Sequence, residues 1–309
     1  MQQGALPNFF VVGTGKAGTT SLYHYLRQHP QIYMSPIKEP CYFASEIRPG
    51  NLDAAHRRHI RRQSEKLAKP YGWLVSEWDD YVALFNSVKK ETAIGEVSPV
   101  YLWSGTAAGN IAARMPEARI IMILRDPGER AFSHYLHQMA VGLIHSTFRE
   151  HLKECFQNRD RTISAYYPFL EVGLYYEQVK RYLERFPENN VRIHWFEEVW
   201  RQPAHFLQDL FEFLNVDLTF SADTSRRSLE RKAPRFPLMN YGMKRFDIAH
   251  RLSGWMPSPV QSAIRKLLFR PGRALVMAPQ DRRFLVNYYR EDIGKLASLL
   301  DRDLSTWLR

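Results

Sequence analysis

A glycine-rich segment near the start of the chain carries the residue types that bind phosphate groups. It runs from Gly13 to Thr20, between the apolar run Phe9–Val12 and the amphipathic segment Ser21–Leu26. A loop of this kind between a buried strand and a helix exposes backbone N–H groups at the positive end of the helix dipole, where anions bind. An alternative role for Thr20, compatible with phosphate binding, is the N-cap of the following helix. We predict a phosphate site with contacts from Gly15, Lys16, Ala17, Gly18, Thr19, Thr20 and Ser21.

A second candidate phosphate site follows the apolar run Ile120–Leu124. This run is followed by Arg125 and then by Pro127, which suits the first turn of a helix. Loops that bind nucleoside triphosphates have the pattern GxxxxGK[ST], in which the lysine follows the last glycine and the next hydroxyl holds Mg²⁺. Here Lys16 precedes Gly18, and a cation stands where a kinase needs an acidic metal ligand. These differences disfavour a kinase, which remains an alternative, and they predict phosphate binding without a metal.

The two sites together resemble those of the sulfotransferases that use 3′-phosphoadenosine 5′-phosphosulfate (PAPS), especially the heparan sulfate type and its soluble bacterial relatives. Val12–Leu22 is similar to the 5′-phosphosulfate loop of that family, and Ile123–Tyr135 is similar to its 3′-phosphate motif. Other segments that resemble the family are Lys38–Phe43, Gly95–Tyr101, Gly173–Gln178 and Asp301–Trp307. The resemblance covers nearly the whole chain. It implies transfer of a sulfuryl group from PAPS, with release of PAP, to a hydroxyl of a carbohydrate, lipid or secondary metabolite.

The resemblance also implies roles for individual residues. Lys16 is expected at the bridging or terminal oxygens of the phosphosulfate, where a compact ammonium group meets the charge that develops during transfer. Arg125 and Ser133 are expected to hold the ribose 3′-phosphate. Tyr175 is a further expected cofactor contact, and Lys232 belongs to a basic late segment that relatives place over the nucleotide.

The proton of the acceptor hydroxyl requires a base, and the resemblance implies Glu39 in the segment that begins with Lys38. A carboxylate beside cationic groups stays ionised and is therefore ready to accept a proton. An alternative is that Glu39 is a surface residue paired with Lys38. His134 and His137, on the helix predicted after Arg125, are rival bases.

Three positions depart from the heparan-type pattern. Cys41 stands where those enzymes often carry His, Ala44 where they often carry Asp, and Val97 where a Lys usually follows the glutamate. In the relatives these positions help to orient a sulfated sugar. The departures therefore weaken the case for a heparan-like acceptor and leave the predicted PAPS site unchanged.

The order of apolar runs and amphipathic segments predicts how these residues are positioned. Short apolar runs predict strands at Phe9–Val12, Ile32–Met34, Ile120–Leu124 and Val191–Trp195, and we expect the first, third and fourth to be buried. Helical periods follow these runs over residues 21–26, 127–141, 175–186, 206–214 and 285–300. This alternation predicts an α/β fold with a P-loop-type, mainly parallel sheet flanked by helices. We expect one domain over residues 1–309, with residues 221–279 as a candidate lid or substrate-facing layer.

The charge of the chain indicates an anionic partner. Its 43 Lys and Arg residues exceed its 32 Asp and Glu residues, which gives a net charge of +11. A nucleic-acid-binding module is therefore a third alternative, although no recognised nucleic-acid motif is present and we expect no nucleic-acid partner. The segment from Trp255 to Phe269 is a candidate contact with a membrane surface, or else a core helix.

The cysteine count and the hydropathy pattern indicate the cellular compartment in which we expect the protein. With Cys41 and Cys155 as its only cysteines, the chain has no disulfide framework. No stretch reaches the roughly 18 apolar residues that a membrane span needs, and the start of the sequence has no cationic segment followed by an apolar core. We therefore expect a cytoplasmic protein.

Overall fold

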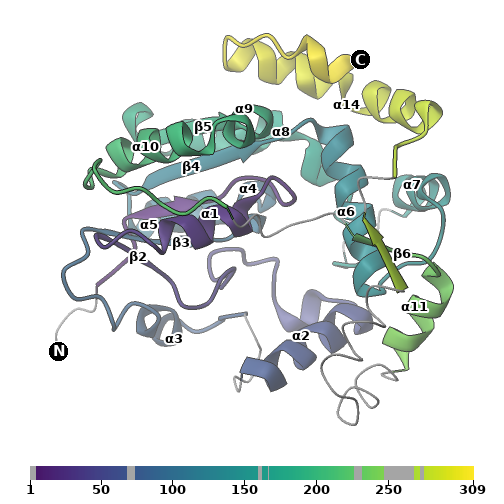
Figure 1. Cartoon of the computed structure of the whole chain (residues 1–309), viewed down its shortest axis with the longest axis horizontal. Helices are drawn as coiled ribbons and strands as arrows, with labels where there is room; N and C mark the ends of the chain where they lie inside the picture. Colours follow the sequence, from purple (N-terminus) through teal and green to yellow (C-terminus); the bar gives the residue numbers. More distant parts are fainter. Residues whose placement is uncertain are drawn as a thin grey trace.

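Five parallel strands form the central sheet of the computed structural model (Figure 1). Their order is β2-β3-β1-β4-β5, with bounds β1 (Phe9–Val11), β2 (Ile32–Met34), β3 (Ala93–Val97), β4 (Arg119–Leu124) and β5 (Val191–Trp195). The structure describes residues 5–67, 74–158, 162–165, 167–225, 232–246, 268–271 and 275–309. The chain thus has the predicted mainly parallel α/β fold with a single domain.

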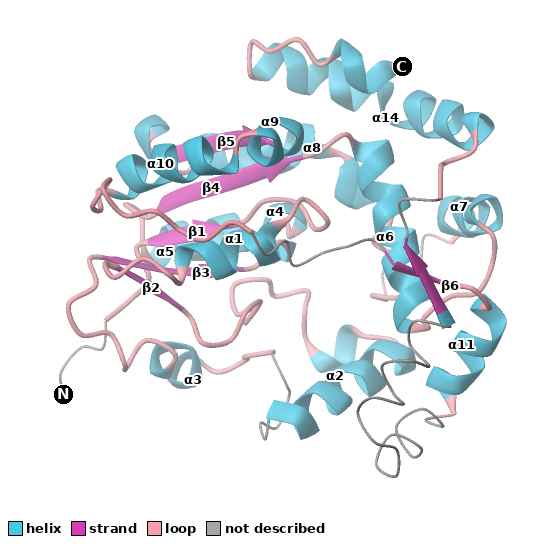
Figure 2. Cartoon of the chain, in the orientation of Figure 1, coloured by secondary structure: helices cyan, strands magenta, loops and turns pink. Residues whose placement is uncertain are grey.

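Helices cover both faces of this sheet (Figure 2). The helices of the described residues are, in chain order, α1 (Thr19–Leu26), α2 (Ala54–Leu67), α3 (Trp78–Ala83), α4 (Val100–Trp103), α5 (Ala107–Arg114), α6 (Pro127–Val141), α7 (Phe148–Gln157), α8 (Tyr175–Leu183), α9 (Phe196–Arg201), α10 (Pro203–Leu214), α11 (Pro237–Arg245) and α14 (Pro279–Leu299). Helices α1 and α10 pack on one face through residues such as Leu22 and Leu210. Helices α5, α6, α8 and α14 pack in the larger core on the other face.

The central strands are apolar throughout because both of their faces are buried. All of β1 is inaccessible to solvent, and β4 is buried from Ile120 onward. Successive side chains of a strand point to opposite faces, so Phe10 and Met122 lie in the larger core while Phe9 and Ile121 lie in the smaller one. Burial on both faces is what the continuous apolar runs predict for a parallel sheet.

Two strands differ from the sequence-based expectation. We did not predict β3, because Gly95 and Glu96 interrupt its apolar pattern. A side chain at Gly95 would meet the Phe9 ring, since an added Cβ would lie 2.4 Å from it. The expectation that Val191–Trp195 is buried was wrong in part: β5 is the edge strand, and Arg192 on it is exposed.

The long helix α14 joins the C-terminus to the second predicted phosphate motif. Asp126 is the N-cap of α6 and accepts a hydrogen bond from the Glu129 backbone N–H at 3.0 Å. Its carboxylate also accepts two hydrogen bonds of 2.6 Å from the Arg282 guanidinium on α14. Arg282 in turn donates to the Trp307 carbonyl at 3.0 Å. The chain segment after β4 is therefore held by residues more than 150 positions away in the sequence.

The predicted lid, residues 221–279, is described only in part. Its described portion contains α11 and two antiparallel strands, β6 (Lys232–Pro234) and β7 (Phe269–Pro271). Residues 226–231, 247–267 and 272–274 lie outside the described part, including most of the segment from Trp255 to Phe269. Both the lid and the membrane contact at that segment remain predictions.

Candidate active site

Loops from four neighbouring strands meet at the carboxyl edge of the sheet. The glycine loop, defined here as residues 13–20, follows β1, and Arg125 follows β4. The segment with Glu39 follows β2, and Ser98 follows β3. Because β1 lies between β3 and β4, the glycine loop occupies the centre of this edge, where ligands bind in open α/β sheets.

Close packing determines where the glycine loop needs glycine. A Cβ at Gly13 would lie 2.2 Å from the backbone nitrogen of Ile123 on β4. Gly18 has a φ of +86°, and a Cβ there would lie 2.2 Å from the ring of Trp200. Trp200, on α9, also donates a hydrogen bond to the Ala17 carbonyl at 3.3 Å. The loop is thus held between β4 and the Trp200 indole, a contact that the sequence analysis did not identify.

Gly15 differs from these two glycines because no atom lies within 4 Å of the position of an added Cβ. We expect Gly13→Ala to lower the free energy of unfolding by about 1–3 kcal/mol, because the backbone of β4 would have to shift. Gly15→Ala should change that free energy by less than about 1 kcal/mol. It should nevertheless weaken the binding of PAP roughly tenfold or more, because its methyl group would fill the predicted phosphate site. Thermal unfolding and calorimetric titration of both variants would check this pair, and equal destabilisation by both would contradict it.

The start of α1 corrects the alternative role for Thr20. The helix begins at Thr19 with Gly18 as its N-cap, so Thr20 is the second helical residue and not the cap. Thr19 and Ser21 are buried and Thr20 is half-buried. The backbone N–H groups at the start of α1 therefore lie immediately after the left-handed turn at Gly18.

Lys16 and Arg125 come from different strand ends and are joined directly. The Arg125 guanidinium donates to the backbone carbonyl of Lys16 at 2.9 Å. It also lies 4.3 Å from the centre of the Phe196 ring and 3.6 Å from the carboxylate of Glu129. The backbone of Lys16 has a φ of +72°, a value that residues other than glycine seldom adopt. Strained residues of this kind cluster at functional sites.

Helix α6 brings Ser133 and His134 toward the same region. Ser133 is buried, and the Arg130 guanidinium one turn earlier is almost fully buried. Arg130 donates to His134 Nδ1 at 3.1 Å and also to the Phe169 carbonyl. Burial, together with the charges of Arg130, His137 and Lys16, holds the pKa of His134 well below its usual range. His134 is therefore neutral near pH 7, with its proton on Nε2.

Tyr175 lies beneath the glycine loop and is fully buried. Among the described residues, neither its hydroxyl nor that of Thr14, which is only 1% exposed, has a hydrogen-bond partner, and burial raises the pKa of the phenol. The ring packs against Trp307 with ring centres 6.1 Å apart. The contact of Tyr175 with the cofactor remains a prediction.

Glu39 lies on a tightly held turn after β2. Its backbone N–H donates to the Val97 carbonyl at 2.9 Å, and its φ is +63°. The side chain is about 41% exposed and forms an ion pair with Lys38. The structure thus contains the Lys38 pairing named as the alternative role, while the turn places the carboxylate at the same sheet edge as the glycine loop.

Behind this turn lies Glu96, a fully buried carboxylate on β3 that the sequence analysis did not single out. It accepts hydrogen bonds from the hydroxyls of Tyr81 and Ser98, both at 2.7 Å, and from that of Tyr101 at 3.0 Å. The Ser98 and Tyr101 oxygens in turn accept from the backbone N–H groups of Cys41 and Phe43. A glutamate inside an otherwise apolar strand was the available signal. Glu96 therefore positions the segment that carries Glu39.

Burial raises the pKa of Glu96 to about 7, against partly offsetting hydrogen bonds from Ser98, Tyr81 and Tyr101. Since this pKa is higher in the folded than in the unfolded state, its contribution to stability is full below about pH 4.5 and is lost as the pH rises to about 7. We expect the free energy of unfolding to fall by about 3 kcal/mol over that interval from this group. Glu96→Gln should flatten the dependence, as urea unfolding between pH 4 and 8 would reveal. An unchanged slope in the variant would mean that another group titrates.

The last predicted contact, Lys232, lies on β6, whose backbone pairs with β7 and whose Ala233 is buried. The side chain of Lys232 lies outside the described part of the structure. Within the described ranges no group of three or more His, Cys, Asp or Glu side chains could hold a metal ion. No helix in those ranges is both long and apolar enough to cross a bilayer.

Known proteins with a similar sequence or structure share this fold. The model of a family described as "Sulfotransferase family" matches residues 7–220, which is more than half of the chain. The crystal structure of a sulfotransferase from Alicyclobacillus acidocaldarius superposes with a TM-score of 0.75 and 30% identity, and the match covers 99% of this chain and 100% of that one.

Curated relatives are more distant and longer. The membrane-associated sulfotransferase kil1 of Dictyostelium discoideum is 23% identical over 96% of this chain and 66% of its own length. The human bifunctional heparan sulfate N-deacetylase/N-sulfotransferase 2 is 26% identical over 98% of this chain and 31% of its own length. Human carbohydrate sulfotransferase 15 is 27% identical over 68% of this chain and 44% of its own. The chain thus spans between about a third and two thirds of the length of these relatives. By its family match and its fold, the chain belongs to the sulfotransferase family.

Proposed function

We propose that this protein is an O-sulfotransferase that takes its sulfuryl group from PAPS. The observation that carries the proposal is the direct link between two strand ends, in which Arg125 donates to the Lys16 carbonyl at 2.9 Å. PAPS has a phosphosulfate at one end and a 3′-phosphate on its ribose, so a site for it needs cationic donors at two neighbouring positions. The family match favours this reaction over the kinase and the nucleic-acid-binding alternatives.

The residues present fit this cofactor. Gly15 leaves open space beside the loop amides, which a Cβ would otherwise fill. Lys16, Thr20 and the N-terminus of α1 would hold the 5′-phosphosulfate, and Arg125 and Ser133 would hold the 3′-phosphate. When bound, PAPS supplies an activated sulfuryl group. Lys16 would neutralise the negative charge that accumulates on the leaving phosphate oxygens.

Glu39 would remove the proton from the acceptor hydroxyl. Its carboxylate is partly exposed at the carboxyl edge of the sheet and is paired with Lys38. His134 is a weaker candidate because arginine only donates hydrogen bonds. The lone pair of His134 Nδ1 is therefore committed to Arg130, and Nε2 carries the proton. Accepting a proton would require the buried Arg130 contact to break.

The acceptor would be a carbohydrate, a lipid or a secondary metabolite with a free hydroxyl. Cys41, Ala44 and Val97 are at most 2% exposed, so none of these three side chains offers a polar atom to a sugar at the site. This supports an acceptor other than a heparan-like chain. Incubation with ³⁵S-labelled PAPS and a panel of hydroxyl acceptors is the direct test, and no labelled product from any class would count against the proposal.

The contribution of Arg125 can be measured without an acceptor. Arg125→Ala should weaken PAP binding by about 1.5–3 kcal/mol, because a charged hydrogen-bond donor to the 3′-phosphate is lost. Ser133→Ala should weaken PAP binding by a smaller amount. Calorimetric titration with PAP and with ADP in EDTA would check this. Equal affinity for the two nucleotides, or loss of binding on chelation, would rule out the assignment.

A further inference from the structure

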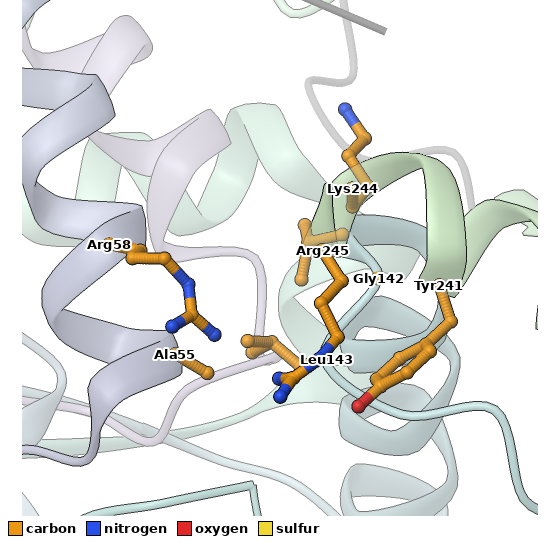
Figure 3. Close-up of a pocket in the computed structure, with 8 residues that line it drawn as sticks. Ala55, Arg58, Gly142, Leu143, Tyr241, Lys244 and Arg245 are labelled. Atoms are coloured by element: carbon orange, nitrogen blue, oxygen red, sulfur yellow. The ribbon is translucent and has the colours of Figure 1, made fainter. Parts of the chain in front are cut away.

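A basic hollow lies between α2 and α11, at the end of α6 that is remote from Arg125 (Figure 3). It is small, with a volume of about 50 Å³, and is lined by Arg58 on α2, by Tyr241 and Arg245 on α11, and by Gly142 and Leu143 after α6. The 15 residues of α6 separate it from Arg125, a distance of roughly 22 Å along the helix. The hollow is thus remote from the Arg125 end of the predicted nucleotide site.

Arg58 and Arg245 give the hollow a positive charge. Figure 3 shows the guanidinium groups of Arg58 and Arg245 directed toward the same space from opposite elements. Among the described residues, no ion pair with Asp or Glu involves either guanidinium, and residues 232–246 contain neither acid. The stem of Lys244 packs against Gly142, where an added Cβ would lie 2.6 Å from it. Two converging guanidinium groups bind phosphate oxygens well.

The outer face of α11 next to this hollow carries large apolar side chains beside the exposed Arg245. Asn240 marks the inner face, because it is buried and donates to the Met139 carbonyl at 2.8 Å. Leu238 lies on the opposite side of the helix and is 68% exposed, while Phe246 at the helix end is 67% exposed and Met239 is 44% exposed. Outer faces of helices are normally polar, so this clustering needs an explanation.

We propose that α11 docks this face of the protein onto a membrane that contains anionic lipids. Lipid phosphates would bind Arg58 and Arg245 in the hollow, and Leu238, Met239 and Phe246 would enter the boundary between headgroups and acyl chains. A soluble anion would occupy the hollow but leave these apolar side chains in water. A membrane surface accounts for both features, because an interfacial helix combines apolar side chains with flanking cations.

Co-sedimentation of the full chain with lipid vesicles tests this proposal. We expect binding to vesicles of phosphatidylcholine and phosphatidylserine in equal amounts, with much weaker binding to phosphatidylcholine alone. Raising the salt concentration should weaken binding because it screens the attraction to the lipid phosphates. Neither measurement depends on PAPS or on sulfuryl transfer, so a failure here leaves the proposed reaction untouched.

Matched variants separate the two contributions. Leu238→Asp should lower the vesicle partition coefficient about tenfold or more, whereas Leu218→Asp, at a 50% exposed position beyond α10, should not. Arg58→Gln combined with Arg245→Gln should also lower it about tenfold or more, whereas the pair Arg283→Gln and Arg290→Gln on the exposed side of α14 should not. Unchanged melting temperatures would show that the variants fold.

Three outcomes would overturn the proposal. The first is equal binding to anionic and neutral vesicles, or none to either. The second is a dimer in sedimentation equilibrium that Leu238→Asp dissociates, since a second copy of the chain would then cover the face. The third is loss of inorganic phosphate binding in the Arg58 and Arg245 variant while vesicle binding stays normal, which would assign the hollow to a soluble anion.

Discussion

Glu39→Gln is expected to lower turnover by roughly 10²–10⁴-fold while PAPS affinity stays nearly unchanged. The amide preserves the size of the side chain and its hydrogen bonding but cannot accept the proton of the acceptor hydroxyl. The backbone of this turn is held by the hydrogen bond to the Val97 carbonyl, so the substitution should leave the turn in place. Steady-state kinetics with an acceptor found in the panel, together with PAPS titration, would measure both quantities.

The control for this prediction is the pair of histidines on α6. His137 is exposed, and His134 is committed to Arg130, so alanine at either position should cost much less than Glu39→Gln. The assignment of the base fails if Glu39→Gln keeps near-normal turnover while His134→Ala or His137→Ala abolishes it in a folded protein. In that case the base lies on the helix after Arg125.

Lys16→Ala should lower turnover by about 10²-fold or more and leave PAP binding largely intact. The reason is that the charge its ammonium meets develops only as the bond between sulfur and the leaving oxygen breaks, and PAP lacks the sulfuryl group. Single-turnover kinetics and PAP titration would separate the two effects. Lys16→Arg keeps the charge but not the compact ammonium, so partial recovery of turnover is expected.

A different result would change the role of this residue. If Lys16→Ala reduces PAP binding and turnover by the same factor, Lys16 is an ordinary phosphate ligand in the ground state. The left-handed backbone at this position makes a second control necessary, because alanine there keeps the same strained φ. An unchanged melting temperature would exclude a collapsed loop as the cause.

The sequence by itself determined the layout of the fold and predicted the two phosphate motifs. Short apolar runs are long enough to identify β1 and β4, because these strands are buried on both faces and tolerate no polar residue in their centres. The strand ends are marked by glycines and a lysine after β1 and by an arginine after β4. Local patterns of this kind record burial and backbone geometry, which are properties of a short segment.

Only the tertiary structure decided what lies around these motifs. Three contacts join positions that are distant in the sequence, so no local pattern records them. They are the contacts of the Trp200 indole with Gly18, of the Phe196 ring with Arg125, and of Arg282 with Asp126. Glu96 appeared to break a strand, but three hydroxyls partly compensate its burial. The tertiary structure likewise made β5 an edge strand, because strand order depends on how the helices cross over the sheet.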